Sequence, residues 1–267
     1  MSSKLYKHIR YKAEIPFIIS QLIREYDISK ANINILFKYG ILSESQYQYF
    51  LKCPRMERQI TIGKMEKNNP KIIKIKQQGI EESRKLFFDA NDISDTDVLS
   101  IRNDAIFLIN KTAKITKFEN IEFLNNNTFS SFYSLDHKDL EAYYMYDSFS
   151  QKEKITIKGM KPEELVKHEN FFLDFLLAVF QSAELEGVEE TIKLIASFNQ
   201  LYVGLELDVE YYRNFDNMSR YIINTKNHSN YLPYIERDDL KHINTICNLN
   251  IIRELWGYIG SIKFRYK

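Results

Sequence analysis

The sequence has few of the residues on which several classes of protein depend. Of its 267 residues, two are cysteines, eight are glycines and five are prolines. Cys53 and Cys247 are far apart and lack the close spacing of zinc ligands, so we expect a reduced protein in which they form no disulfide. The glycines are scattered, and none of them belongs to a glycine-rich loop of the kind that binds phosphates.

Motifs of several hydrolase classes are also missing. The five histidines form neither a His-x-x-x-His nor a His-x-x-Glu-His pair, and no Gly-x-Ser-x-Gly nucleophile elbow occurs. The net charge is only +1, which creates no overall field that favours a polyanion. Any site for nucleic acid must therefore come from local clustering of charge.

Long apolar runs are absent as well. No stretch of 18 apolar residues occurs, so we expect no span of a membrane and no membrane partner. The first eight residues lack the apolar centre of a signal peptide. We therefore expect a cytoplasmic location.

The apolar residues are sufficient for a core and change their spacing along the chain. Apolar residues make up 44% of the sequence and aromatic residues 14%. Their period changes from 3.6 residues to 2 and back, which predicts an α+β fold with N-terminal helices, a central antiparallel sheet over residues 97–158 and a helical C-terminal part. The change near Gly159 predicts two domains, an α+β domain with an antiparallel meander at 1–159 and a helical domain at 160–267.

The most β-like stretch runs from Asp97 to Lys111. A polar group of three residues, Arg102-Asn103-Asp104, interrupts its apolar residues. Such an interruption indicates a tight hairpin, a strand end, or a carboxylate held at the edge of a sheet for chemistry.

The N-terminal region leaves two alternatives open. Basic and aromatic residues alternate over 1–16, which suits contact with phosphates and bases or, alternatively, a mobile or edge segment with solvated charges. Over residues 17–40 the apolar spacing favours two helical segments, with Asp27 or Ser29 as the cap of the second and Gly40 at its end. The alternative is a strand over 21–28 that leads into a helix at Lys30.

Local signals mark the next helices. Ser43 and Gln46 form the pattern of a capping box before a helix at 44–52. Residues 55–69 are polar and basic, with Gly63 as a break, and Pro70 begins a long helix through Phe88.

The remaining elements follow from alternation and periodicity. Beyond Lys111 we expect strands with turns between them, and beyond Gly159 we expect helices. The expected strands cover 116–124, 129–135, 140–146 and 155–157, the turns lie at 125–127 and 136–139, and the helices cover 162–187, 188–203 and 238–262.

Two acidic motifs are candidates for chemistry. The first is the stretch from Glu25 to Ile33 and the second is the stretch from Ile101 to Phe107. Two-metal phosphoryl transfer needs carboxylates on adjacent rigid elements, so that both reach ions about 4 Å apart. Basic residues could then contact phosphates or nucleic acid. The candidates are Arg55, Arg58, Lys64, Lys74 and Arg102.

These motifs resemble a known family. Residues 99–107, Leu-Ser-Ile-Arg-Asn-Asp-Ala-Ile-Phe, resemble the apolar-His-Asp-acid-apolar motif of family A DNA polymerases and single-subunit phage RNA polymerases. Tyr-Asp-Ile-Ser at 26–29, followed by Ala-Asn-Ile at 31–33, resembles their other palm motif. The sequence departs from the pattern at Asn103, where those families have His, at Ala105, where an acid is common, and in a shorter spacing between the motifs.

The resemblance implies a palm-like, Mg²⁺-dependent nucleotidyltransferase, or a degenerate relative, that acts on nucleic acid and comes from a phage or mobile element. It implies that Asp27 and Asp104 are the catalytic, metal-binding pair. It also places Arg58 and Lys64 near the triphosphate-binding helix.

A non-catalytic interpretation remains open from the residues alone. Asp27 would then cap a helix, and Asp104 would lie in a turn or pair with Arg102. The protein would be an accessory or structural subunit that binds nucleic acid or protein, with the aromatic C-terminal helices as a surface for a protein partner. The two interpretations differ in whether Asp27 and Asp104 lie together in an open cleft.

Overall fold

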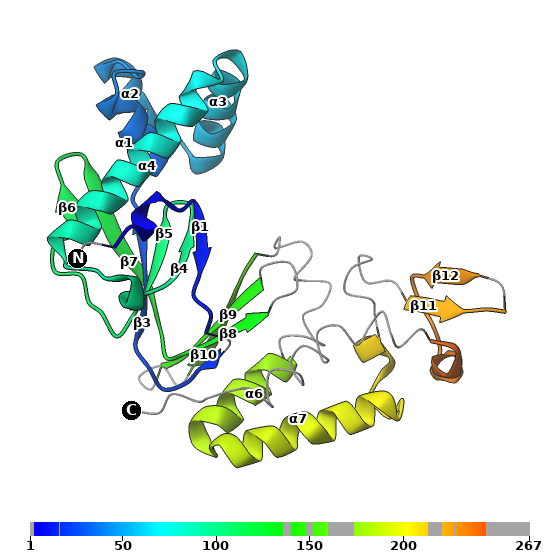
Figure 1. The fold of residues 1–267 in the computed structure, drawn as a ribbon. Coiled ribbons are helices and arrows are strands. Elements are labelled where there is room, and N and C mark those ends of the chain that lie inside the picture. The colour runs from blue at the N-terminus through cyan, green and yellow to red at the C-terminus, as the bar shows by residue number, and fades with distance from the viewer. Residues whose placement is uncertain are drawn as a thin grey trace. The chain divides into compact units, whose positions relative to one another are not determined.

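The computed structural model describes residues 3–15, 17–135, 140–147, 152–159, 174–212, 221–226 and 228–243. Helices and antiparallel strands are both present, which confirms the predicted α+β class (Figure 1). The chain divides into two compact units. One consists of residues 1–14 and 22–128, and the other of residues 15–21 and 129–267. The predicted domain division at residue 159 differs from this partition and stays a prediction.

The first unit is built on a six-stranded sheet with the order β1-β4-β5-β3-β7-β6. β3 and β4 both pair antiparallel with β5, which lies between them, so β3 and β4 run parallel to each other. The chain crosses from β3 to β4 through four helices, which makes this a split β-α-β unit. The strands are β1 (Arg10–Lys12), β3 (Ile23–Ile28), β4 (Val98–Arg102), β5 (Ala105–Ile109), β6 (Lys117–Phe118) and β7 (Ile121–Phe129).

The four crossing helices are α1 (Ala31–Lys38), α2 (Glu44–Lys52), α3 (Arg55–Asn68) and α4 (Lys71–Ala90). The C-terminal half of α4 covers the sheet, and α1, α2 and α3 gather around its other half (Figure 1).

Aromatic packing fixes α4 against the strands. The ring of Phe87 lies 4.2 Å from that of Phe123 on β7 and 5.3 Å from that of Tyr26 on β3, measured between ring centroids. Burial of such large rings is a main source of the stability of this unit. A second apolar cluster joins the helices to one another, and it includes Ile33, Leu36, Leu42, Phe50, Ile62 and Ile72.

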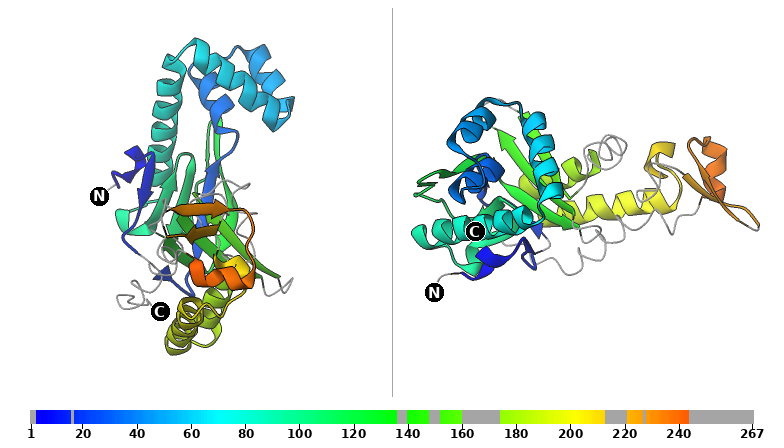
Figure 2. Two further views of the ribbon diagram at one scale, coloured as in Figure 1. Left: turned by 90° about the vertical axis from the view of Figure 1, so that its right-hand side faces the viewer. Right: turned by 90° about the horizontal axis from the view of Figure 1, so that it is seen from above.

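The second unit has a four-stranded antiparallel sheet with the order β10-β9-β8-β2. Two helices pack on it, and Phe180 of α6 stacks on Tyr144 of β9 with ring centroids 5.3 Å apart. A hairpin follows near the C-terminal end of α7, where Figure 2 shows it together with η6. The elements are β2 (Phe17–Ile18), β8 (Ser131–Leu135), β9 (Leu140–Asp147), β10 (Lys152–Lys158), α6 (Asp174–Leu185), α7 (Val188–Val203), η5 (Val209–Tyr212), β11 (Tyr221–Asn224), β12 (Ser229–Leu232) and η6 (Arg237–His242).

The favoured helix before residue 28 is wrong, and the alternative strand is right. Residues 23–28 form β3, which leads into α1. This strand has buried residues on both faces, including Ile23, Tyr26 and Ile28, so its apolar residues do not alternate strictly. The capping prediction is also wrong. The residue before α1 is Lys30, and it makes no side-chain cap.

Other local predictions had mixed outcomes. The capping box of Ser43 and Gln46 begins α2 as expected, and α7 has the predicted bounds. Gly63 was expected to break the chain but lies inside α3. Residues 125–127 were expected in a turn but lie inside β7. The strands expected to form one sheet over residues 97–158 belong to two sheets.

Some predictions lie partly outside the described residues. The beginning of the helix predicted at 162–187 lies outside them. Most of the helix predicted at 238–262 also lies outside them, and the described part of that range contains η6. Cys53 is buried and free, and Cys247 lies outside the described part, so the prediction about a disulfide stays open. Among the described helices, none combines the length and the apolar character that crossing a bilayer requires.

Candidate functional site

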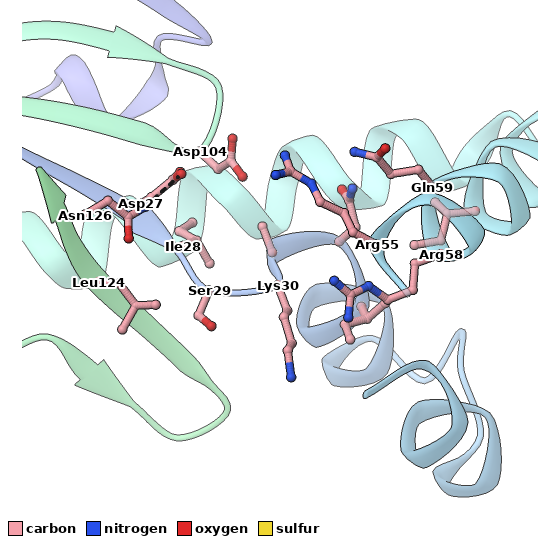
Figure 3. A pocket seen from close by; sticks show the side chains of 14 residues that line it. Asp27, Ile28, Ser29, Lys30, Arg55, Arg58, Gln59, Asp104, Leu124 and Asn126 are labelled. Carbon is pink, nitrogen blue, oxygen red and sulfur yellow. Dashed lines mark hydrogen bonds between the residues drawn. The ribbon is translucent and has the colours of Figure 1, made fainter. Parts of the chain in front are cut away.

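The two acids singled out in the sequence lie at the same end of neighbouring strands. Asp27 on β3 is registered against Ala105 on β5. Asp104 is the residue directly before Ala105, so the pairing places it beside the end of β3. Both acids line one open cavity of about 460 Å³ in the first unit. Figure 3 shows their side chains next to each other at the strand ends.

A two-residue turn positions Asp104. Arg102 pairs with Ala105 across the β4–β5 hairpin, which leaves Asn103 and Asp104 as the connection. Asn103 has a φ of +55°, a left-handed conformation that asparagine tolerates better than most residues. Its backbone N–H donates to the carbonyl of Ile9 at 2.8 Å. The polar interruption thus forms a tight hairpin and also presents a carboxylate at the end of the sheet.

Asp27 has a partner on the opposite neighbouring strand. The Nδ2 of Asn126 on β7 donates to Oδ2 of Asp27 at 3.3 Å. Strands on both sides of β3 therefore contribute to the acidic wall. Sequence analysis missed Asn126 because a run of three asparagines is typical of turns.

Basic side chains form the opposite wall of this cavity. Arg55 and Arg58 lie one turn apart on α3 and extend from that helix into the cavity (Figure 3). The guanidinium of Arg58 also donates to the carbonyl of Phe50 at 3.4 Å, which ties it to α2. The cavity therefore has carboxylates on one side and guanidinium groups on the other. Its lining further includes Lys30, Asn32, Gln59 and Leu124.

Burial dominates the electrostatics of Asp104. Burial raises the pKa of its carboxyl above the ordinary value, and this effect exceeds the opposing effects of a hydrogen bond from its own backbone and of the cations Lys76, Arg55 and Arg84. The surrounding cations therefore do not fully compensate for the loss of hydration. A divalent cation bound at this carboxylate would lower the pKa again.

The other predicted phosphate contacts do not line this cavity. Lys64 on α3 and Lys74 on α4 are exposed and do not line this cavity. Arg102 is half-buried at the end of β4, next to the turn. The basic N-terminal arm contributes β1, an edge strand that pairs with β4. Contact of these residues with phosphate stays a prediction.

The acidic pair suits one kind of metal site. The described residues contain no group of three or more Asp, Glu, His or Cys side chains arranged to hold an ion. Mg²⁺ is commonly bound by one or two carboxylates, several waters and the phosphates of a substrate, without a complete cage of protein ligands. Asp27 and Asp104 line an open cavity and have the carboxylate oxygens that such a site would use.

Comparisons with known proteins identify a family. No curated protein matches the chain. A family model described as "Bacteriophage PBS1 gene 130 protein" matches residues 1–259. The phage in this description agrees with the phage part of the sequence-based prediction. Because the match covers well over half of the sequence, the chain belongs to the Bacteriophage PBS1 gene 130 protein family.

Proposed function

We propose that this protein is a palm-like, Mg²⁺-dependent nucleotidyltransferase that acts on nucleic acid. One observation carries the proposal. Asp27 and Asp104 lie at the same end of adjacent antiparallel strands and line a single cavity, opposite Arg55 and Arg58. An acid that only formed a turn would not need a second acid beside it and two arginines across from it.

The chemistry assigns a role to each side of the cavity. Asp27 and Asp104 would hold Mg²⁺, which, when bound, polarises a phosphoryl oxygen and stabilises the attacking and leaving oxygens. Arg55 and Arg58 would orient the triphosphate, because a guanidinium donates two parallel hydrogen bonds to a phosphate. The acids alone would repel a nucleotide, so the basic wall is needed to bind it.

The size and openness of the cavity support this assignment. Its volume of about 460 Å³ lies within the range of small-molecule sites, roughly 300–1,000 Å³. Its opening to solvent leaves room for a nucleic-acid strand to approach the acids. The split β-α-β topology supplies rigidity, because both acids are attached to the central strands of the sheet.

The experiment measures Mg²⁺-dependent extension of a primed DNA or RNA template by the full chain, with deoxynucleotides and ribonucleotides in separate reactions. We expect incorporation by the wild type, and a loss of at least about a hundredfold in Asp27→Asn and in Asp104→Asn, because each removes a metal ligand. The matched control is Asp92→Asn. Asp92 is exposed and has a φ of +49°, which asparagine accepts.

The proposal fails if the wild type shows no Mg²⁺-dependent incorporation on either template, or if both acid variants retain wild-type rates. Binding of the template without turnover, unaffected by either substitution, would favour the non-catalytic alternative, an accessory subunit that binds nucleic acid.

A further inference from the structure

A second cavity adjoins the acidic pair. Its volume is about 370 Å³, and Asp104 lines both cavities. One face of α4 forms much of its wall, because Lys76, Ile80 and Arg84 follow one another at intervals of four residues. The rest of the lining comes from Ile9, Asn32, Glu66, Ile73, Gln77 and Asn103.

Arg84 is the unusual residue of this cavity. Its side chain is only 1% exposed, and Nη1 donates to the backbone carbonyl of His8. Its Nε–H has no acceptor among the described residues. Burial lowers the pKa of Arg84 to about 10, which still leaves the guanidinium charged at neutral pH. The carboxylates of Glu81 and Asp104 favour the charged form but do not offset the effect of burial, so a further anion in this cavity would stabilise the guanidinium.

Lys76 is the second cation of the cavity. Its Nζ lies 2.5 Å from Oε1 of Glu66, and both side chains remain partly accessible. An ammonium group has three N–H donors, so the contact with Glu66 leaves donors for an anion. Lys76 is therefore held in place by Glu66 but remains available to an anion.

The spacing of the two cations indicates the size of the ligand. A helix rises about 1.5 Å per residue, so the Cα atoms of Lys76 and Arg84 are about 12 Å apart along α4. The side chains of Lys76 and Arg84 start from well-separated positions on α4 and line the same cavity, so a chain of two or three phosphates can contact both. The amides of Gln77 and Asn103 add neutral hydrogen-bond donors.

We propose that this second cavity is a binding subsite for a di- or triphosphate group, with Lys76 and Arg84 as its cations. Two sources share this chemistry, free pyrophosphate and the phosphates of a nucleotide. The subsite lies beside Asp104, so its role in turnover rests on the proposed function. Binding of phosphates in the subsite does not depend on the proposed function, because the contacts come from protein cations and amides and need no metal.

The test is calorimetric titration of the full chain with pyrophosphate in metal-free buffer containing a chelator. We expect Lys76→Gln to weaken binding by about tenfold or more, the effect of losing one charge-assisted contact. Glu66→Gln should tighten binding by a few fold, because it removes a competing carboxylate. The matched control is Lys52→Gln, which alters an exposed lysine on α2. The thermal midpoint of each variant establishes that it is folded.

Competition identifies the source of the phosphates. A nucleoside triphosphate that displaces pyrophosphate, with the same dependence on Lys76, assigns the subsite to the nucleotide. Pyrophosphate binding that a nucleotide does not displace assigns it to free pyrophosphate. Asp27→Asn should abolish turnover but leave pyrophosphate affinity unchanged, which separates this proposal from the catalytic one. Absence of pyrophosphate binding, or equal affinities in the wild type, Lys76→Gln and Glu66→Gln, would overturn the inference.

Discussion

Asp27 and Ala105 form a registered pair between β3 and β5, and this pair brings Asp104 to the same end of the sheet as Asp27. The preceding pair, Tyr26 with Ile106, contributes both side chains to the core beneath α4. A slip by one residue would turn Tyr26 away from that core and Asp27 into it. The packing of Tyr26 therefore fixes the position of Asp27.

The first prediction concerns the stability of Asp104→Asn. Burial raises the pKa of Asp104, so the native state disfavours the ionised carboxylate relative to the unfolded chain. Asparagine removes this unfavourable charge. We expect the thermal midpoint at neutral pH to rise by about 2–4 °C, the effect of roughly 1 kcal/mol in a protein of this size. The measurement is thermal unfolding followed by circular dichroism.

The difference in stability between Asp104→Asn and the wild type depends on pH, because the pKa of Asp104 is raised in the folded state. Because the folded-state pKa lies above the unfolded value, the wild type gains stability from this group as the pH falls through the folded-state pKa. The gain in stability of Asp104→Asn over the wild type should therefore be largest at pH 7 and shrink towards about pH 4, near the ordinary pKa of an aspartate. A variant that is less stable than the wild type at pH 7 would mean that Asp104 mainly stabilises the hairpin.

The second prediction concerns Arg55 and Arg58. Each lines the cavity opposite the acids, so replacing either by glutamine removes a charge that would face the triphosphate. In the extension assay we expect KM for the nucleotide to rise by about tenfold, with a smaller effect on kcat. Lys67→Gln is the control, because Lys67 is exposed near the end of the same helix and outside the cavity. An unchanged KM in both arginine variants would argue against this binding mode.

Local signals in the sequence were sufficient for much of the fold. Ser43 and Gln46 predicted α2 because a capping box depends only on neighbouring residues. The hairpin around Asp104 was predictable for a similar reason, since a polar pair between two apolar runs favours a tight turn. The two acids could be named as candidates from their flanking residues.

Features that depend on tertiary contacts could not be read in this way. β3 is buried on both faces, which removes the alternation that marks a strand. Asparagine favours turns, but Asn126 lies in a strand because β7 continues through it to Phe129. Arg84 is buried against the carbonyl of His8, 76 residues away, and no local pattern indicates that contact.

The third prediction compares two glycines within helices. A Cβ added to Gly79 on α4 would lie 2.3 Å from Cγ2 of Ile35, so α1 and α4 would have to separate. Gly79→Ala should therefore lower the free energy of unfolding by about 1–3 kcal/mol, although alanine favours the helix itself. Gly63→Ala meets no atom within 4 Å and should instead stabilise α3 by about 0.5–1 kcal/mol. Urea unfolding measures both, and effects of the same sign would contradict this packing.

The last prediction concerns Asn91, a buried amide that follows α4. Its Nδ2 donates to the carbonyls of Phe87 at 2.9 Å and Ile115 at 2.7 Å. Its Oδ1 accepts from the backbone N–H groups of Lys114 at 2.7 Å and Ile115 at 2.9 Å. One side chain thus joins the end of α4 to the segment that precedes β6.

Asn91→Ala leaves these backbone groups without their partner, and each buried unpaired group costs about 1–3 kcal/mol. Water can reach part of this segment, so we expect a total loss of about 2–4 kcal/mol in the free energy of unfolding, measured in urea. Asn68→Ala, at an exposed position at the end of α3, is the control and should change stability by less than about 0.5 kcal/mol. Hydrogen exchange should also become faster at the amides of Lys114 and Ile115. A loss of stability without faster exchange there would mean that Asn91 acts through α4 alone.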